Sequence, residues 1–588
     1  MSITPRGMSV QEAYRLYRDD KLEVNRKYQR KLVWTIGEKQ SLIDSIINDY
    51  PIPLILLAEE KGRSKYEILD GMQRLNAIFS YIDNGFPCND KYFDIGEFSR
   101  ANQAHEAGLF KKAELGSKLL EPNHCADFLD YQLAVTIFPA VDDSQVTDVF
   151  GRINSGGRQL SWQEKRQAGM TDAFSNLVRV VSSEIRGDAS RERLPLVEMP
   201  EISIDSARLE LGYQLVAEDI FWCKQGVLWV KQLRDSEDEE IIADIGSSII
   251  LSKPIAKSKD LLDEIYDYET AVFKEVRTAL SAYGEERLKE EIKVTFSVLN
   301  EIIENVDPGQ NALRKAINPK STNPIKAAFY SLFMALHDLV INEEKSPDNY
   351  GEIFKAISGL QKQMKTTAKY SKSEDRVKNI SITKGLIQNF FVKKDPPLLR
   401  HGAGLALDLE NSLRRSKIET SRYECKQGLV DLSPSRKLAQ GILPKIVDTL
   451  CAIANVGPDA DGFLFIGVAD KEEDANRIRD LDKEDAVRVG NRFVVGIERE
   501  LSHLNCSLEA YLSKVLSAIK DSNLSEPLKS NILSQVDTID YRGKTIIRLR
   551  VPKQSEVSFV GDMAYVREGS STTEASGKKL LAANSLFS

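Results

Sequence analysis

The chain has 588 residues, of which 42% are hydrophobic and 29% are charged, and its formal net charge is −8. This composition is that of a globular protein, and the length is enough for several domains. The net negative charge argues against a protein that coats nucleic acid nonspecifically. Its apolar runs are too short to span a bilayer, no signal-peptide pattern is present, and the six cysteines are scattered. We therefore expect a cytoplasmic protein with reduced thiols and no membrane partner.

Residues 1–170 mix short strand-like and helix-like patterns, which predicts an α+β domain. Within it, residues 66–78 read Tyr-Glu-Ile-Leu-Asp-Gly-Met-Gln-Arg-Leu-Asn-Ala-Ile, so we expect a strand to give way to a helix there. The N-terminus of such a helix is a good seat for a phosphate. Arg74 adds a forked cation for phosphate oxygens, and Asp70 adds a carboxylate suited to holding a metal or orienting a water. The same residues also fit an ordinary turn followed by a helix.

Two more segments accompany this turn. Tyr28-Gln29-Arg30 lies upstream, four residues before Trp34, and residues 150–161 read Phe-Gly-Arg-Ile-Asn-Ser-Gly-Gly-Arg-Gln-Leu-Ser. In this order the three segments resemble the ParB/sulfiredoxin-like domain of the GmrS half of GmrSD-type restriction systems, although Met72 stands where that family usually has Gln. The resemblance implies a nucleoside triphosphate site in which Asp70 is a catalytic candidate. Its nucleotide-binding candidates are Tyr28, Gln29, Arg30, Gly71, Gln73, Arg74, Arg152 and Asn154.

Residues 171–400 have mostly helical periodicity, which predicts a helical domain or linker. The acidic run at residues 235–240 fits an exposed loop or a helix start, and Asn323-Pro324 fits the start of another helix. The stretch from Lys362 to Arg400 contains ten Lys or Arg residues and only three acidic residues. Such a cluster can follow a phosphate backbone, but a solvated helix face is the more common explanation.

Residues 405–577 return to an α/β pattern, and residues 578–588 are expected to form a loose tail. The run Phe463–Val468 predicts one buried strand, and residues 557–567 predict a hairpin that turns at Gly561-Asp562. Glu424 and Lys426 are two residues apart, so on a strand they share one face. A carboxylate that holds Mg²⁺ or Mn²⁺ beside an ammonium suits phosphodiester chemistry, although by pattern alone an exposed salt bridge is favoured.

The surrounding sequence helps to choose between a metal site and an exposed salt bridge. Glu419 precedes Glu424-Cys425-Lys426, residues 452–455 read Ala-Ile-Ala-Asn, and residues 462–470 read Gly-Phe-Leu-Phe-Ile-Gly-Val-Ala-Asp. With Tyr565-Val566-Arg567, these motifs resemble the Schlafen AlbA-like domain. The resemblance implies a metal-dependent cleavage site in which Glu419, Glu424 and Asp470 hold the metal and Lys426 contacts the phosphate. Many members of that family are described only as nucleic-acid binders, and Cys425 replaces the usual Phe.

We therefore expect a multidomain α+β protein with a ParB/sulfiredoxin-like N-terminal domain, a helical middle and an AlbA-like C-terminal α/β domain. The leading hypothesis is a prokaryotic anti-phage defence effector, a nucleotide-regulated and metal-dependent nuclease acting on foreign, modified or unmodified, DNA or RNA. The alternative is a nucleotide-switched nucleic-acid sensor whose AlbA-like domain is noncatalytic and which recruits a partner nuclease or regulates transcription. A homodimer or a partner defence protein is the expected assembly.

Overall fold

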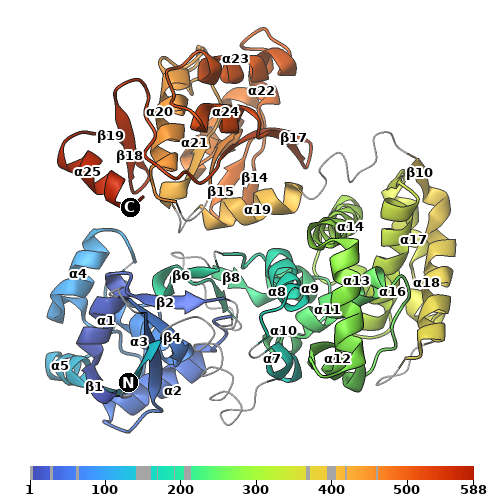
Figure 1. The fold of residues 1–588 in the computed structure, drawn as a ribbon, viewed down its shortest axis with the longest axis horizontal. Helices are drawn as coiled ribbons and strands as arrows, with labels where there is room; N and C mark the ends of the chain where they lie inside the picture. The colour runs from blue at the N-terminus through green and yellow to red at the C-terminus, as the bar shows by residue number, and fades with distance from the viewer. Residues whose placement is uncertain are drawn as a thin grey trace. The chain divides into compact units, whose positions relative to one another are not determined.

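The computed structural model describes residues 4–26, 31–60, 65–110, 112–140, 161–167, 170–190, 192–203, 214–365, 371–393, 405–416, 420–458 and 461–587. The chain divides into two compact units, residues 1–404 and residues 405–588 (Figure 1). None of the helices in these described ranges is both long and apolar enough to cross a membrane.

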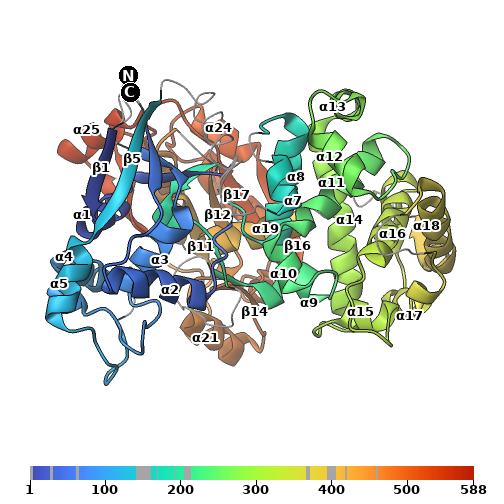
Figure 2. The same cartoon turned by 90° about the horizontal axis from the view of Figure 1, so that it is seen from below.

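The first unit begins with a six-stranded mixed sheet of order β1-β5-β3-β4-β2-β6. Its strands are β1 (Thr4–Ser9), β2 (Leu22–Asn25), β3 (Ile55–Glu60), β4 (Tyr66–Asp70), β5 (Gln132–Ala140) and β6 (Arg193–Pro195). The helices that accompany it are α1 (Val10–Arg18), α2 (Ile36–Ile47), α3 (Met72–Ile82), α4 (Ser99–Glu106) and α5 (Pro122–Asp130). Helices α2 and α3 lie side by side (Figure 2) and bury Ile43, Ile78 and Phe79 in the core of this region. Because β4 leads directly into α3, the sheet places the Asp70-Gly71 turn at the end of a strand.

The rest of the first unit is helical. Its helices are α7 (Trp162–Gln167), α8 (Ala173–Arg186), α9 (Phe221–Lys224), α10 (Val230–Arg234), α11 (Glu237–Ile250), α12 (Lys259–Tyr266), α13 (Ala271–Tyr283), α14 (Glu285–Val306), α15 (Ala312–Ile317), α16 (Lys326–His337), α17 (Tyr350–Ala356) and α18 (Ser373–Ile387). Two short strand pairs join them: β7 (Glu201–Ser203) with β8 (Gln214–Val216), and β9 (Lys345–Pro347) with β10 (Phe391–Lys393). Helix α14 packs against α8 and α16 (Figure 2).

The second unit is built on a four-stranded sheet of order β11-β12-β17-β16, in which β11 and β12 are parallel. Its strands are β11 (Tyr423–Lys426), β12 (Gly462–Ile466), β13 (Val468–Ala469), β14 (Val487–Val489), β15 (Arg492–Val494), β16 (Val536–Tyr541), β17 (Lys544–Val551), β18 (Ala564–Glu568) and β19 (Ser571–Ala575). Its helices are α19 (Leu405–Arg415), α20 (Ile442–Ala454), α21 (Glu472–Asp482), α22 (Glu498–Leu501), α23 (Leu508–Lys520), α24 (Leu528–Leu533) and α25 (Lys578–Ser585).

Both faces of the four-stranded sheet are covered, which makes it the centre of the second unit. Leu464 and Ile547 pack in one apolar cluster with residues of α20, α23 and α24. Phe465 and Ile546, their chain neighbours, pack in another cluster with residues of α19. Alternate strand residues point to opposite faces, so this double coverage explains the continuous apolar run at residues 463–466.

Three local features of this unit differ from the sequence-based expectations. The run Phe463–Val468 is divided at Gly467, whose φ of +104° carries the chain from β12 into the separate sheet β13-β15-β14. At Gly561-Asp562 only an isolated bridge forms, between Val560 and Met563, and the hairpin β18–β19 turns later, at Gly569-Ser570. The tail forms α25, which is held because Ala583 is buried in a small apolar cluster.

Candidate functional site

The Asp70-Gly71 turn has the strand-to-helix geometry that the sequence predicts. Gly71 is the N-cap residue of α3 and has φ of +101°, a left-handed conformation that side chains disfavour. A Cβ atom on Gly71 would lie 3.0 Å from Cγ1 of Ile55. Among the residues that the structure describes, no side chain caps α3, and the start of such a helix, with its N–H groups and positive dipole end, suits an anion.

Arg74 lies one helical turn into α3, and one of its guanidinium nitrogens already forms hydrogen bonds within the protein. Its Nη2 atom donates to Oδ2 of Asp70 and to the carbonyl oxygen of Leu54, each at 2.9 Å. Its Nε atom is buried, and no described residue accepts a hydrogen bond from it. Asp70 also accepts a 2.7 Å hydrogen bond from the Gly71 amide, and 44% of its side chain is exposed. An orphaned donor beside an uncapped helix start fits an incoming phosphate.

Gln73 holds a neighbouring segment of the chain. Its Oε1 atom accepts hydrogen bonds from the amides of Val33 and Trp34, and its Nε2 atom donates to the carbonyl oxygen of Lys31 at 2.7 Å. These bonds hold residues 31–34 beside the start of α3. Gln73 thus positions the segment that follows Tyr28-Gln29-Arg30 in the chain.

Six of the predicted site residues lie outside the described ranges. They are Tyr28, Gln29, Arg30, Arg152, Asn154 and Glu419. Their roles stay predictions.

In the second unit, Glu424 and Lys426 lie on one face of β11. Nζ of Lys426 is 2.5 Å from Oε1 of Glu424, and Nη2 of Arg567 is 2.9 Å from Oε2. Arg567 comes from β18, and its side chain is only 1% exposed. Both oxygens of this carboxylate therefore face cations. Cys425 points to the other face of the strand, where burial raises the pKa of its thiol to about 11.

The hairpin that carries Arg567 is held by Asn455 at the end of α20. Nδ2 of Asn455 donates to the carbonyl oxygens of Ser558 and Tyr565, at 2.9 and 2.8 Å, and its Oδ1 accepts from the Ser558 amide at 2.7 Å. A buried amide with three such bonds fixes the backbone that it contacts. Asn455 therefore positions Arg567 against Glu424.

Asp470 follows β13 and forms its own ion pair with Arg492 of β15. Arg492 also donates from Nε to Oγ of Ser416 at 2.7 Å and from Nη2 to the Ser416 carbonyl oxygen at 3.0 Å. About half of the Asp470 side chain is exposed. In the described ranges this pair shares no residue with the pairs of Glu424.

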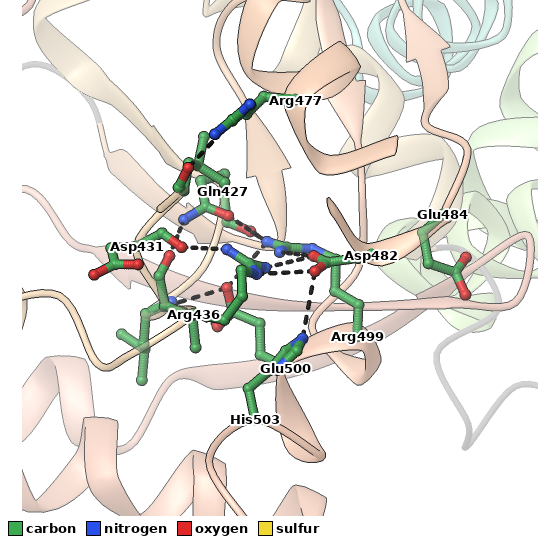
Figure 3. Close-up of polar contacts among 12 residues, drawn as sticks. Gln427, Asp431, Arg436, Arg477, Asp482, Glu484, Arg499, Glu500 and His503 are labelled. Atoms are coloured by element: carbon green, nitrogen blue, oxygen red, sulfur yellow. Dashed lines mark hydrogen bonds and ion pairs between the residues drawn. The ribbon is translucent and has the colours of Figure 1, made fainter. Parts of the chain in front are cut away.

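A buried ionic network supports the loop that directly follows β11 (Figure 3). Asp482 accepts hydrogen bonds from both Arg436 and Arg499, and Glu500 accepts from the amides of Leu429 and Val430. Burial opposes ionisation of Asp482, but hydrogen bonds from the two arginines outweigh it and lower the pKa of its carboxyl group. The network fixes residues 427–437, and with them the end of the strand that carries Glu424 and Lys426.

The donor chemistry at β11 fits a hard divalent cation, because Mg²⁺ and Mn²⁺ prefer carboxylate oxygens. Glu424 offers such oxygens on β11, Asp470 offers them after β13, where it pairs with Arg492, and Glu419 would supply the third carboxylate. The described ranges contain no group of three or more His, Cys, Asp or Glu side chains arranged to hold a metal. The metal set therefore stays a prediction.

The basic stretch between Lys362 and Arg400 is partly used inside the first unit. Arg376 is buried and makes a two-bond ion pair with Asp244, at 2.8 and 2.6 Å. Lys384 pairs with Asp338 and Glu343 at 2.5 Å each. Arg376 and Lys384 therefore form ion pairs within the helical region, and the burial of Arg376 differs from the solvated helix face expected from the sequence.

The comparisons with known proteins point to a component of a restriction-type defence system, because two family models match separate parts of the chain. Residues 14–170 match the family model of the GmrSD restriction endonuclease N-terminal domain, and residues 419–576 match that of the Schlafen AlbA_2 domain. No curated protein and no solved structure gave a significant match.

Sequence reasoning missed the two arginines that face the acidic candidates of the second unit. Arg567 lies 143 residues after Glu424, and Arg492 lies 22 residues after Asp470. The only signal for Arg567 is its place in the Tyr-Val-Arg motif near the end of the domain. Arg492 has no motif that marks it.

Proposed function

We propose that the chain is a nucleotide-regulated, metal-dependent nuclease of a restriction-type defence system, acting on foreign DNA or RNA. The observation that carries this proposal is the cluster of Glu424 and Lys426 on β11 with Arg567 of β18, within the region that matches a Schlafen AlbA_2 domain. Glu424 supplies a metal ligand, Lys426 supplies a partner for a phosphate oxygen, and the buried Arg567 orients the carboxylate of Glu424.

In the second unit, Glu424, Asp470 and Glu419 would hold Mg²⁺ or Mn²⁺. When bound, such an ion polarises a phosphoryl oxygen and lowers the pKa of a coordinated water. Lys426 contacts the phosphate of the bound strand and neutralises charge that develops on it, while the buried Arg567 holds Glu424 in place. Asn455 and the Asp482 network keep these side chains in place.

In the first unit, the start of α3 receives the phosphates of a nucleoside triphosphate. The uncapped amides and Nε of Arg74 donate to phosphate oxygens, while Asp70 is free on its exposed side to hold a metal ion or orient a water. Arg30, Arg152 and Asn154 complete the set of nucleotide contacts, and Gln73 holds the segment next to Arg30.

The nuclease proposal is tested with labelled DNA and RNA and the full chain, in Mg²⁺ or Mn²⁺, with and without nucleotides. Glu424→Gln keeps the shape of the side chain but removes its charge, and we expect cleavage to fall about 100-fold or more. Glu568→Gln is the matched control, because Glu568 is an exposed acid on β18, paired with Lys579. Equal cleavage by wild type and Glu424→Gln would contradict the assignment.

The second candidate function is a noncatalytic nucleic-acid clamp. It is favoured by one observation: Lys426 and Arg567 engage both oxygens of Glu424, and Arg492 engages Asp470. In that case strand binding survives chelation of divalent ions and the loss of Glu424, and a partner protein performs the cleavage.

A further inference from the structure

Residues Arg26 and Lys31 lie on either side of residues 27–30, and both are tied to buried acids. Arg26 donates from Nη2 to Oδ2 of Asp188 at 3.1 Å. Nζ of Lys31 donates to the carbonyl oxygen of Leu233 at 2.8 Å and lies 3.6 Å from Oδ1 of Asp238. Asp188 and Asp238 have no exposed side-chain surface.

One arginine joins these two acids. Arg186, the last residue of α8, contacts Oδ1 of Asp188 through Nε at 2.9 Å and Oδ2 of Asp238 through Nη1. Its side chain is 2% exposed, and Nη1 also lies 3.3 Å from Glu239. The guanidinium thus bridges the acid that holds Arg26 and the acid that holds Lys31.

The ion pairs of this group join three basic side chains to three acidic ones. Arg26, Lys31 and Arg186 are three cations, and Asp188, Asp238 and Glu239 are three acids. A paired and hydrogen-bonded set can be buried, whereas loss of one member leaves an uncompensated charge inside the protein. Such a network has one well-defined geometry, which suits a positioning role.

Asp238 belongs to the acidic first turn of α11, and this turn also holds the chain beyond residues 150–160. Glu240, two residues later, accepts a 2.7 Å hydrogen bond from Nη1 of Arg166 in α7. Helix α7 starts directly after residues 150–161, the segment that contains Arg152. At its start the Ser161 amide donates to the Glu164 carboxylate, and the Glu164 amide donates to the Ser161 hydroxyl. The same helical turn therefore anchors residues adjoining both segments.

We infer that Arg186 and Asp238 are positioning residues of the nucleotide site, and that α8 and α11 form part of that site. This inference rests on the proposed nucleotide binding and extends it beyond residues 14–170, where the GmrSD match ends. The path is short: Gln73 holds the carbonyl of Lys31, Lys31 reaches Asp238, and Asp238 meets Arg186. A nucleotide at the start of α3 is thereby linked to the helical region.

The test measures binding of ATP, GTP, CTP and UTP, in separate titrations, to the full chain. Asp238→Asn is expected to weaken the preferred nucleotide about 10-fold or more, and Arg186→Lys, which keeps the charge, to weaken it less. The control is Arg376→Lys, because Arg376 makes a buried ion pair with Asp244 of the same helix α11 but has no contact with residues 26–34 among those described. The control should lower thermal stability while the nucleotide affinity stays within about twofold.

Hydrogen exchange on the wild-type chain gives a second readout that needs no variant. Nucleotide is expected to increase protection of the amides of Val33 and Trp34 and of the first turn of α11, but not of α18. Unchanged affinity in Asp238→Asn, or protection confined to α3, would overturn the positioning role and leave nucleotide binding intact. Absence of nucleotide binding by wild type would overturn the nucleotide site itself, and the positioning role with it.

Discussion

Gln73 and Arg567 each join segments that are distant in the sequence. Gln73 holds the backbone of residues 31–34, and Arg567 meets a carboxylate 143 residues earlier in the chain. In both cases one long polar side chain makes several hydrogen bonds, and so orders a site without being its reacting group. The exposed carboxylate of Asp70 orders no distant segment: it accepts hydrogen bonds only from the nearby Gly71 amide and Arg74 among the described residues.

Gly71 is the residue at which the backbone of the nucleotide site is most constrained. Gly71→Ala is expected to lower the free energy of unfolding by about 2–3 kcal/mol, since it forces a Cβ into both a left-handed φ and contact with Ile55. Urea unfolding measures this change.

The matched control is Gly359→Ala in the same unit. Gly359 has φ of +69°, but a Cβ there would meet no atom within 4 Å. Only the backbone cost of about 1 kcal/mol remains. Equal losses in the two variants would show that Ile55 does not restrict the turn.

At the scale of elements, local periodicity predicts α3, α20 and β11 well, because each has one clear apolar face or a strict alternation. It also places Glu424 and Lys426 together, since a strand repeats every two residues. The ion pairs with Arg567 and Arg492 follow from chain topology, which no local pattern encodes.

The remaining differences have physical causes of the same kind. The acidic run at residues 235–240 is predicted from the sequence to be an exposed loop or a helix start, and it starts helix α11. Asp238 in this run is buried because Arg186 and Lys31 compensate its charge. Helix α16 begins at Lys326, two residues after Pro324, so the N-cap residue is Ile325 and not Asn323. The tail is ordered by tertiary contacts, which override its weak local preference.

The Asp482 network makes the stability of the second unit depend on pH. The pKa of Asp482 is lowered in the folded state, so its stabilisation is complete above the unfolded-state pKa of about 3.9 and is lost as the pH falls through the lower folded-state value. Asp482→Asn is expected to cost about 3–5 kcal/mol at pH 7, because Arg436 and Arg499 lose the buried carboxylate that they share. The gap from wild type narrows below about pH 4.

Denaturant unfolding from pH 7 to pH 3 checks this prediction. Glu484→Gln is the control two residues away, where an exposed pair with Lys544 is worth less than about 1 kcal/mol. A gap between wild type and Asp482→Asn that stays constant with pH would contradict the assigned ionisation.

At the scale of the whole molecule, the chain has two compact units, and each carries one candidate site. The first unit adds a helical region to the GmrSD N-terminal domain, and Arg186 and Asp238 belong to that region. A nucleotide bound in the first unit therefore has a structural route into its helices.

The most direct measurement is cleavage of labelled DNA and RNA across a range of nucleotide concentrations, comparing wild type, Arg74→Gln and Glu424→Gln. Arg74→Gln should raise the nucleotide concentration needed for half-maximal effect about 10-fold. Nucleotide-free cleavage should stay unchanged, because Arg74 is proposed to bind the phosphates of the nucleotide and not those of the cleaved strand. Glu424→Gln should lower cleavage about 100-fold or more at every nucleotide concentration. An identical nucleotide response in wild type and Arg74→Gln, together with full cleavage by Glu424→Gln, would contradict the account in both units.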